Sequence, residues 1–424
     1  MKNLLISLLL IFCLSNCNKN AFTEHEVEKV WVPAEEQLET YQTLLTAHQS
    51  GWEFIMERPN DHGVYYGLMN FKNENEIDFL VDYAIRYTKY QPGKINFAVH
   101  NGSPSFSFPK YSPFANFIDH AGGLDSLYTF NKIVNDTLFL DGNGVGVKLK
   151  LYKCPPEKNQ ALRNNSMAKN KDDLFKIFSM KRFFFYLNKG GQSFDIALDT
   201  LRKEFVINYG TNEDFKAFTS KYYFDQDGIV LQKPFSDSGV EFRKLKPQSQ
   251  SEFTAIFDEG ITITNEPKPK RYNLQIVSDF KGHDAHFGWG SYAGLSTRDQ
   301  LDIANMRAIN EVEFFSIFPT FIIEDEPPVI HGLAAFIMKS GDIALGMDRQ
   351  LTKFTDDGRV YFERYIVEEH PSSNEINAAK AKITPYFYNE KGFYIIGDNN
   401  GLYLVDARDG LTWAHFRSLT RMPQ

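Results

Sequence analysis

The stretch INFAVHNGSPSFSF, residues 95–108, decides the fold class because it has the form of a complete β-hairpin. Apolar and polar side chains alternate in much of both halves, which is the pattern of half-buried strands. Between the halves stands Asn101-Gly102, a dipeptide that favours a two-residue hairpin turn. The stretch therefore predicts two antiparallel strands joined by a tight turn.

The same arrangement of an aromatic strand, a turn with glycine and an apolar strand recurs at residues 223–231 and 386–396. These copies indicate either an internal duplication or simply the common form of hairpins, and the sequence leaves both interpretations open. Asp141-Gly142 and Asp357-Gly358 mark further turns of the same kind. We therefore expect a chain built largely of hairpins.

Composition agrees with this expectation and excludes several classes of protein. Aromatic residues make up 15% of the 424 residues, with 38 Phe, which argues against disorder and suits β-rich packing. Lys and Arg number 46 and Asp and Glu number 54, so the formal net charge is −8. An acidic chain without a basic run is a poor nucleic-acid binder, and we expect no nucleic-acid partner.

The predicted fold class is α+β and β-rich, with mostly antiparallel curved sheets built of hairpins and a few short packing helices. Helices are expected after Pro33, after Ser112-Pro113 and from Asn212 to Ser220, and a strand from Arg271 to Phe280. A polar, proline-containing seam at 265–270 divides the chain into an N-terminal β-rich lobe, 34–265, and a C-terminal β-rich lobe, 266–424. The polar segment 155–171 is expected to be an exposed loop inside the first lobe.

The N-terminus has the layout of a secretory signal, with Lys2 followed by an apolar run over 4–14. The run is too short to span a membrane by itself. The exit Leu14-Ser15-Asn16-Cys17 is typical of a bacterial lipoprotein box, which predicts a signal peptide over 1–16, acylation of Cys17 and a tether over 17–33. A plain secretory signal cut nearby is the alternative. Cys154 is then the one remaining cysteine, and we expect it to be a buried apolar residue.

The most suggestive stretch for ligand binding is 282–292, which combines several glycines with His283, His286, Trp289 and Tyr292. Aromatic faces stack on sugars and apolar ligands, so these four residues are the candidate ligand-binding set. Two histidines three apart suit a metal only on a helix, and the glycines favour a loop, so no metal is assigned. An ordered loop with Trp289 plugging the core is the plain alternative.

Other polar and aromatic signals have structural explanations that we favour. Asp225-Gln226-Asp227-Gly228 begins like a calcium loop but lacks the later acidic ligands, so a hairpin turn is expected. Trp52, Tyr65, Tyr66 and Trp413 lie in alternating runs, which favours core packing over ligand binding. No nucleophile elbow, phosphate loop or dinucleotide motif is present, so neither catalytic residues nor a cofactor are assigned.

Three passages together resemble a known family. They are 49–53 after a helix, the hairpin 96–111 with Ser112-Pro113, and 392–416. This set resembles the Bacteroidetes lipoproteins grouped as domain of unknown function 4302, over roughly residues 35–416. That family is often encoded beside starch-utilisation-type outer-membrane uptake systems and zinc peptidase-like lipoproteins, and it offers no catalytic residues to carry over.

The resemblance implies a non-enzymatic outer-membrane accessory lipoprotein that serves nutrient capture or uptake. Its partners would be membrane lipid through Cys17, an outer-membrane uptake complex, and a small glycan or peptide ligand. Surface-displayed lipoproteins of that phylum often have an acidic cluster after the cysteine. Asn18-Lys19-Asn20 lacks this cluster, so the sequence leaves open whether the protein is at the cell surface or on the periplasmic face of the membrane. An exported hydrolase with an unrecognised site and a structural partner of an uptake complex are the alternatives.

Overall fold

The computed structural model describes most of the chain up to residue 282 and parts of the remainder. The described residues are 32–59, 63–180, 182–200, 202–211, 214–282, 289–291, 312–321, 331–338, 343–344, 349–366, 374, 381, 384–385, 387–398, 401–411 and 413–418.

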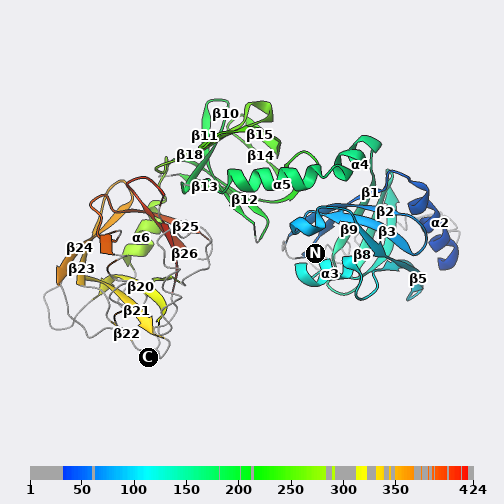
Figure 1. The fold of residues 1–424 in the computed structure, drawn as a ribbon, viewed down its shortest axis with the longest axis horizontal. Helices are drawn as coiled ribbons and strands as arrows, with labels where there is room; N and C mark the ends of the chain where they lie inside the picture. Colours follow the sequence, from blue (N-terminus) through cyan, green and yellow to red (C-terminus); the bar gives the residue numbers. More distant parts are fainter. Residues whose placement is uncertain are drawn as a thin grey trace, which may run out of the picture.

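Three nine-stranded antiparallel sheets follow one another along the chain, each forming its own lobe (Figure 1). In each sheet the first strand pairs with the last, so that β1 pairs with β9, β10 with β18 and β19 with β27. Neighbours in the sheet are otherwise mostly neighbours in sequence, as expected of a chain of hairpins. The β-rich α+β fold predicted from the sequence is confirmed.

The first sheet is ordered β4-β3-β2-β1-β9-β8-β7-β6-β5. Its elements are α2 (Ala34–Ala47), β1 (Trp52–Glu57), β2 (Val64–Phe71), β3 (Glu76–Val81), the 3₁₀ turn η2 (Ile85–Tyr87), β4 (Gln91–Lys94), β5 (Asn96–His100), β6 (Ser103–Ser107), α3 (Pro113–Ala121), β7 (Leu127–Val134), β8 (Thr137–Gly142) and β9 (Lys148–Lys153).

Local sequence signals in this lobe act as expected. Asn101 and Gly102 have φ of 49° and 75°, the two positive values that a type I′ turn requires, and they join β5 to β6. The Ser112 hydroxyl accepts a hydrogen bond from the Ala115 amide at 3.1 Å, and Pro113 occupies the first turn of α3. The hairpin and both helices predicted here are confirmed.

The second sheet is ordered β15-β14-β13-β12-β11-β10-β18-β17-β16. Its elements are α4 (Pro156–Arg163), α5 (Ser166–Ile177), β10 (Phe184–Lys189), β11 (Gln192–Asp199), β12 (Glu204–Gly210), β13 (Phe215–Phe224), β14 (Ile229–Asp237), β15 (Val240–Leu245), β16 (Pro247–Gln250), β17 (Thr254–Phe257), η3 (Asp258–Gly260) and β18 (Thr262–Glu266).

Two expectations for this lobe are wrong. The segment 155–171, expected to be an exposed loop, forms α4 and the first half of α5. Its prolines begin α4 rather than breaking a helix, and Leu162, Met167 and Leu174 are buried although polar residues separate them. A helix is expected from Asn212 to Ser220, but from Phe215 onwards this segment is β13 and pairs with β12. Pairing with the sheet outweighs a weak capping signal there.

The third sheet is ordered β20-β19-β27-β26-β25-β24-β23-β21-β22, and β20 also pairs with β21. Its elements are α6 (Leu274–Gly282), β19 (Trp289–Ser291), β20 (Val312–Phe321), β21 (His331–Met338), β22 (Ile343–Ala344), β23 (Arg349–Phe354), β24 (Arg359–Ile366), β25 (Phe393–Asp398), β26 (Gly401–Asp406) and β27 (Trp413–Ser418). The strand expected from Arg271 to Phe280 is wrong. Most of it is the helix α6, which presents Phe280 to the core at a helical spacing from Ile276.

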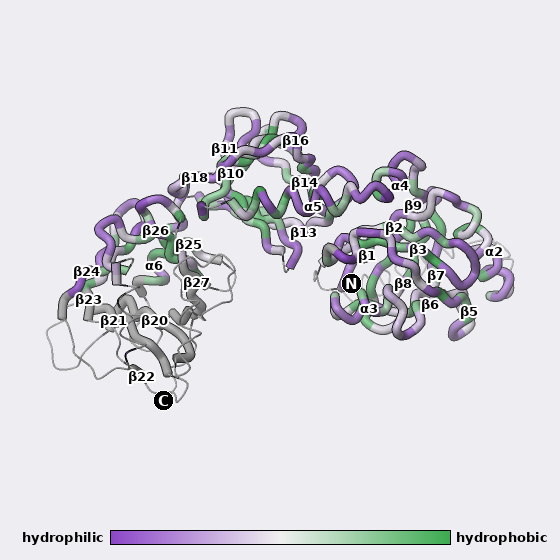
Figure 2. The backbone as a smooth tube through the Cα atoms, in the orientation of Figure 1, coloured by the Kyte–Doolittle hydropathy of each residue, from purple (hydrophilic) through white to green (hydrophobic). Residues whose placement is uncertain are grey.

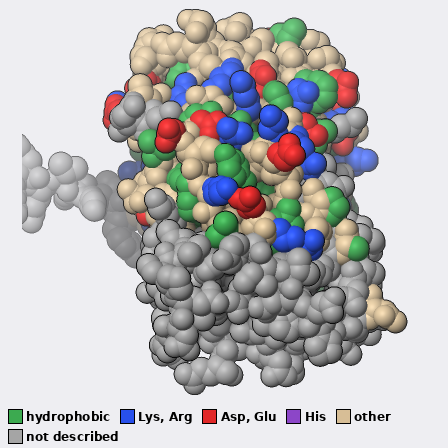
Figure 3. All heavy atoms as spheres, turned by 90° about the vertical axis from the view of Figure 1, so that its left-hand side faces the viewer, with side chains coloured by type: hydrophobic (Ala, Val, Ile, Leu, Met, Phe, Trp, Pro, Cys, Tyr) green, Lys and Arg blue, Asp and Glu red, His purple; other side chains and the backbone are tan. Residues whose placement is uncertain are grey.

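The predicted seam at 265–270 follows the last strand of the second sheet, so the lobe expected at 34–265 contains two of the three sheets. Phe184 and Tyr186 of β10 pack with Tyr394 and Trp413 from the third sheet. On the third lobe Lys and Arg side chains are mixed with Asp and Glu over the described surface (Figure 3).

One apolar core lies inside the first lobe, and a second core joins the first lobe to the second. The first is covered by α2 and α3. The second combines Tyr66, Leu68 and Leu80 of the first sheet with residues of α4, α5 and the second sheet. Strand β2 is thus buried on both faces, which accounts for its nearly continuous apolar sequence. Figure 2 shows hydrophobic residues along the strands and hydrophilic ones at many outer turns.

Among the described residues, none of the helices combines the length and the apolar character that crossing a bilayer requires.

Candidate functional site

The residues singled out from the sequence are mostly outside the described part of the chain. Cys17, His283, His286 and Tyr292 all lie outside the described residues. The backbone of Trp289 lies in β19, where it pairs with Ile317 and Ser418 rather than standing in an open loop. The ligand-binding role of this set and the acylation of Cys17 stay predictions.

The structural interpretations of other signals are confirmed. Asp225 to Gly228 forms the β13–β14 turn, in which the Asp225 carboxylate accepts hydrogen bonds from the Asp227 and Gly228 amides. The Lys244 ammonium lies between the carboxylates of Asp225 and Asp227, at 2.7 and 2.6 Å. The predicted core aromatics are buried, namely Trp52, Tyr65, Tyr66 and Trp413.

Cys154 is buried within the core between the first and second lobes. Burial raises the pKa of its thiol to about 12, and its sulfur donates a hydrogen bond to the Pro155 carbonyl. A thiol with so high a pKa is a poor nucleophile, so the structure supports the inert role expected for it.

A cavity of about 290 Å³ lies where the first sheet, α5 and the second sheet meet. The first sheet contributes β2 and the segment after β3, α5 contributes two side chains, and the second sheet contributes the β11–β12 turn and the end of β13. Its walls are Tyr65, Asp82, Tyr83, Ala84, Lys171, Phe175, Thr200, Lys203, Tyr222 and Phe224. The volume is at the lower end of the range for ligand pockets, roughly 300–1,000 Å³.

Asp82 is the charged centre of this cavity, and its side chain has no exposed surface. Its carboxylate accepts hydrogen bonds from the Tyr66 amide of the first sheet and the Phe224 amide of the second, both at 2.9 Å. It also accepts one from the Lys203 ammonium at 2.5 Å. One carboxylate therefore ties the two lobes together.

Two lysines face this single carboxylate. Lys203 stands in a left-handed turn conformation, with φ of 52°, and its ammonium also lies 4.7 Å from the centre of the Tyr65 ring. Lys171 of α5 donates hydrogen bonds to the backbone carbonyls of Tyr83 and Asp82. Its ammonium lies 5.5 Å from the Phe224 ring centre, a cation–π distance.

Burial governs the protonation of all three groups. It lowers the pKa of Lys171 to about 8, although the charge of Asp82 acts in the opposite direction. Burial likewise lowers the pKa of Lys203 and raises that of Asp82, and the attraction between these two partners opposes both shifts. The cavity therefore holds ionisable groups under strong desolvation, which is common at functional sites and also in structural ion pairs.

The remaining wall is largely aromatic. Tyr222, which is 1% exposed, lines it and carries a hydroxyl. Thr200 is exposed on the β11–β12 turn, so it lies where the cavity reaches solvent. Asp82 is committed to three donors and is therefore poorly placed to act as a general acid or base.

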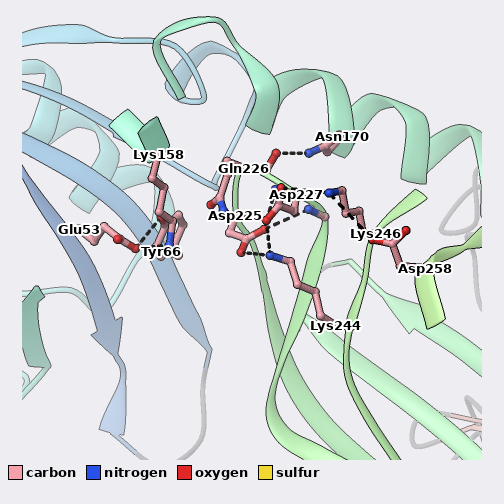
Figure 4. A network of polar contacts seen from close by, with 11 residues as sticks. Glu53, Tyr66, Lys158, Asn170, Asp225, Gln226, Asp227, Lys244, Lys246 and Asp258 are labelled. Carbon is pink, nitrogen blue, oxygen red and sulfur yellow. Dashed lines mark hydrogen bonds and ion pairs between the residues drawn. The ribbon is translucent and has the colours of Figure 1, made fainter. Parts of the chain in front are cut away.

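A second polar network lies beside the cavity and fixes α4 and α5 to both lobes (Figure 4). Lys158 of α4 forms an ion pair with Glu53 of β1 at 2.5 Å, and the Tyr66 hydroxyl donates to the same carboxylate at 2.9 Å. Asn170 of α5 donates to the Gln226 carbonyl in the β13–β14 turn at 2.5 Å. The Tyr66 ring stacks on Tyr223, with centroids 5.3 Å apart. These contacts hold the cavity walls in place.

Sequence reasoning missed the cavity residues because they are far apart in the chain. Asp82 is separated from Lys171 by 89 residues and from Lys203 by 121. The usable signal was the nearly continuous apolar run of β2, which indicates burial on both faces and therefore a second layer packed against it. Among the described residues, His, Cys, Asp and Glu form no group of three or more placed to hold a metal ion.

The fold and the cavity define a β-rich protein of three antiparallel sheets, with a small pocket between the first two that opens to solvent at Thr200. Comparison of the sequence with known protein families identifies the family to which it belongs. The family described as Domain of unknown function (DUF4302) matches residues 33–249, just over half of the chain, and the chain belongs to that family. The matched range includes every residue that lines the cavity.

No curated protein matches the chain. Among solved structures, the DNA polymerase III β chain of Streptococcus pneumoniae is 9% identical, covering 91% of this chain and 98% of that one, with a TM-score of 0.15. The H. pylori β clamp in complex with 5-chloroisatin is 10% identical, covering 92% and 98%, with a TM-score of 0.14. At TM-scores this low the likeness carries no argument about fold or function.

Proposed function

We propose that this protein is a non-enzymatic, lipid-anchored accessory protein that binds a small ligand in the cavity between its first and second sheets. The anchor is Cys17, the membrane is the bacterial outer membrane, and the role is capture of a nutrient for an uptake complex. The anchor and the uptake role come from the signal sequence and the family resemblance.

The observation that carries the binding role is the cavity itself. It is lined by aromatic rings and a few convergent polar groups, which is the usual composition of ligand pockets. Its walls come from two lobes and a helix that are fixed to one another by the Asp82 and Glu53 networks. A preformed pocket lowers the entropic cost of binding, because few side chains have to be ordered when the ligand enters.

Thr200→Trp tests this role by filling the mouth of the cavity with an indole. Thr219→Trp is the matched control, since Thr219 is also exposed on the second lobe but does not line the cavity. Short glycans, peptides and small organic molecules, neutral and charged, would be screened by thermal shift and confirmed by calorimetry. We expect a ligand that stabilises the wild type and Thr219→Trp but not Thr200→Trp. The proposal fails if ligands bind all three proteins equally, or if none binds.

A further inference from the structure

We propose that the ligand of this cavity is a small monoanion with an apolar body, such as an arene or branched aliphatic carboxylate, whose charge pairs with Lys171. This inference rests on the binding function proposed above and names the chemical class of the ligand.

The charged groups around the cavity are not balanced. Two ammonium groups, on Lys171 and Lys203, face one carboxylate, on Asp82. Lys203 is paired with that carboxylate at 2.5 Å, whereas Lys171 donates only to backbone carbonyls and otherwise lies over the rings of Phe175 and Phe224. A buried charge without a counter-ion costs several kcal/mol. The cavity therefore has one uncompensated positive charge at neutral pH, and a single negative charge on the ligand would balance it.

Several hydrogen-bond donors line the cavity. An ammonium has three N–H groups, and Lys171 donates to two carbonyls, which leaves one N–H for a ligand. Tyr222 and, at the mouth, Thr200 also line the cavity, and each carries a hydroxyl that can donate a hydrogen bond. Because a buried donor that lacks an acceptor is costly, an acceptor-rich carboxylate fits these groups better than a donor-rich amide or alcohol.

The rest of the cavity is small and lined by aromatic rings. The rings of Tyr65, Tyr83, Phe175 and Phe224 form its walls, so the body of the ligand contacts mainly aromatic faces. A volume of about 290 Å³ lies at the lower end of the range for ligand pockets, which favours a small ligand such as one with a single ring. Inorganic phosphate would bring up to two negative charges and no apolar surface, so it satisfies neither feature.

Proton linkage gives the inference a second readout. Burial lowers the pKa of Lys171 to about 8 in the free protein, and a bound anion would raise it again. The charged groups that face Lys171 are Asp82 and Lys203, and both are already paired with each other. Above pH 8, binding of the anion should therefore be accompanied by proton uptake at Lys171.

The experiment compares phenylacetate with phenylacetamide, which has nearly the same shape without the charge, and with inorganic phosphate. Calorimetry is carried out on the wild type, Lys171→Met and Lys176→Met. Lys176 is the matched control, since it lies on the same helix in an exposed pair with Asp172. We expect phenylacetate to bind about ten- to a hundredfold more tightly than the amide, and this preference to disappear in Lys171→Met only.

A second measurement keeps the test valid if Lys171→Met does not fold. In the wild type, titrations at pH 8.5 in buffers of different ionisation enthalpy should show proton uptake with phenylacetate and none with phenylacetamide. Equal affinity for the two probes overturns the monoanion inference and leaves the binding function standing. Tighter binding of phosphate than of phenylacetate overturns it as well. Failure of both aromatic probes also overturns it, and the binding function is then judged by the glycan and peptide screen.

Discussion

Replacing Asp82 with Asn should destabilise the packing of the first lobe against the second. The effect should be larger than that of removing a charge from any exposed side chain. The carboxylate has no exposed surface, and it accepts hydrogen bonds from the Tyr66 and Phe224 amides and from Lys203. Asn removes the negative charge and leaves the Lys203 ammonium without its counter-ion. Removing one partner of a buried pair costs about 3–5 kcal/mol in free energy of unfolding.

Asp78→Asn is the control, since Asp78 forms an ion pair with Lys72 at 2.8 Å on a more exposed surface, where the side chains are 18% and 47% exposed. Pairs of that kind contribute about 0–1 kcal/mol. The assay is urea unfolding followed by tryptophan fluorescence, with hydrogen exchange measured by mass spectrometry on peptides that contain Tyr66 and Phe224. Both amides should lose protection in Asp82→Asn. A loss of less than 1 kcal/mol, or unchanged protection of both amides, would refute the role assigned to Asp82.

Three further outcomes are expected. The pKa of Lys171 is about 8 in the folded protein and 10.5 in its ordinary state, so the unfolded protein binds more protons between these two pH values. The free energy of unfolding of the wild type should therefore rise relative to that of Lys171→Met by about 3 kcal/mol from pH 8 to pH 10.5. Urea unfolding of both proteins measures this difference, and a difference that stays constant over the range would contradict the buried position of Lys171. Iodoacetamide at pH 8 should leave Cys154 unmodified in the folded protein and alkylate it in urea, because burial raises the pKa of its thiol to about 12; peptide mapping checks this, and rapid native labelling would show that the thiol is accessible. Cys17→Ser should move the protein from the membrane to the soluble fraction, and a variant that stays membrane-bound in a high-salt wash would exclude the lipid anchor.

Features encoded over a few neighbouring residues could be predicted from the sequence. The Asn101-Gly102 turn and the α3 start at Ser112-Pro113 each depend on backbone geometry that their own residues impose. The β-rich class followed from many such signals together. The helix α4 and the first half of α5 were missed because their buried side chains, such as Leu162 and Met167, are spaced among polar residues that dominate the composition of the segment.

The cavity belongs to a different kind of feature. Asp82 follows β3, Lys171 lies on α5, and Lys203 stands in a left-handed turn after β11, so only the packing of two lobes brings them together. Each of the three, taken alone in the sequence, resembles an ordinary surface charge. Their burial is set by the second core, which forms between segments that are distant along the chain. The sequence candidates around Trp289 depend on residues outside the described range and stay predictions.

The most direct test of the binding role is a crystal structure of the protein grown with phenylacetate. The account predicts density for the ligand in the cavity, with its carboxylate within hydrogen-bonding distance of the Lys171 ammonium and its ring against Phe175 and Phe224. Asp82 should keep its bonds to Tyr66, Phe224 and Lys203. A ligand bound elsewhere with the cavity empty would contradict the account.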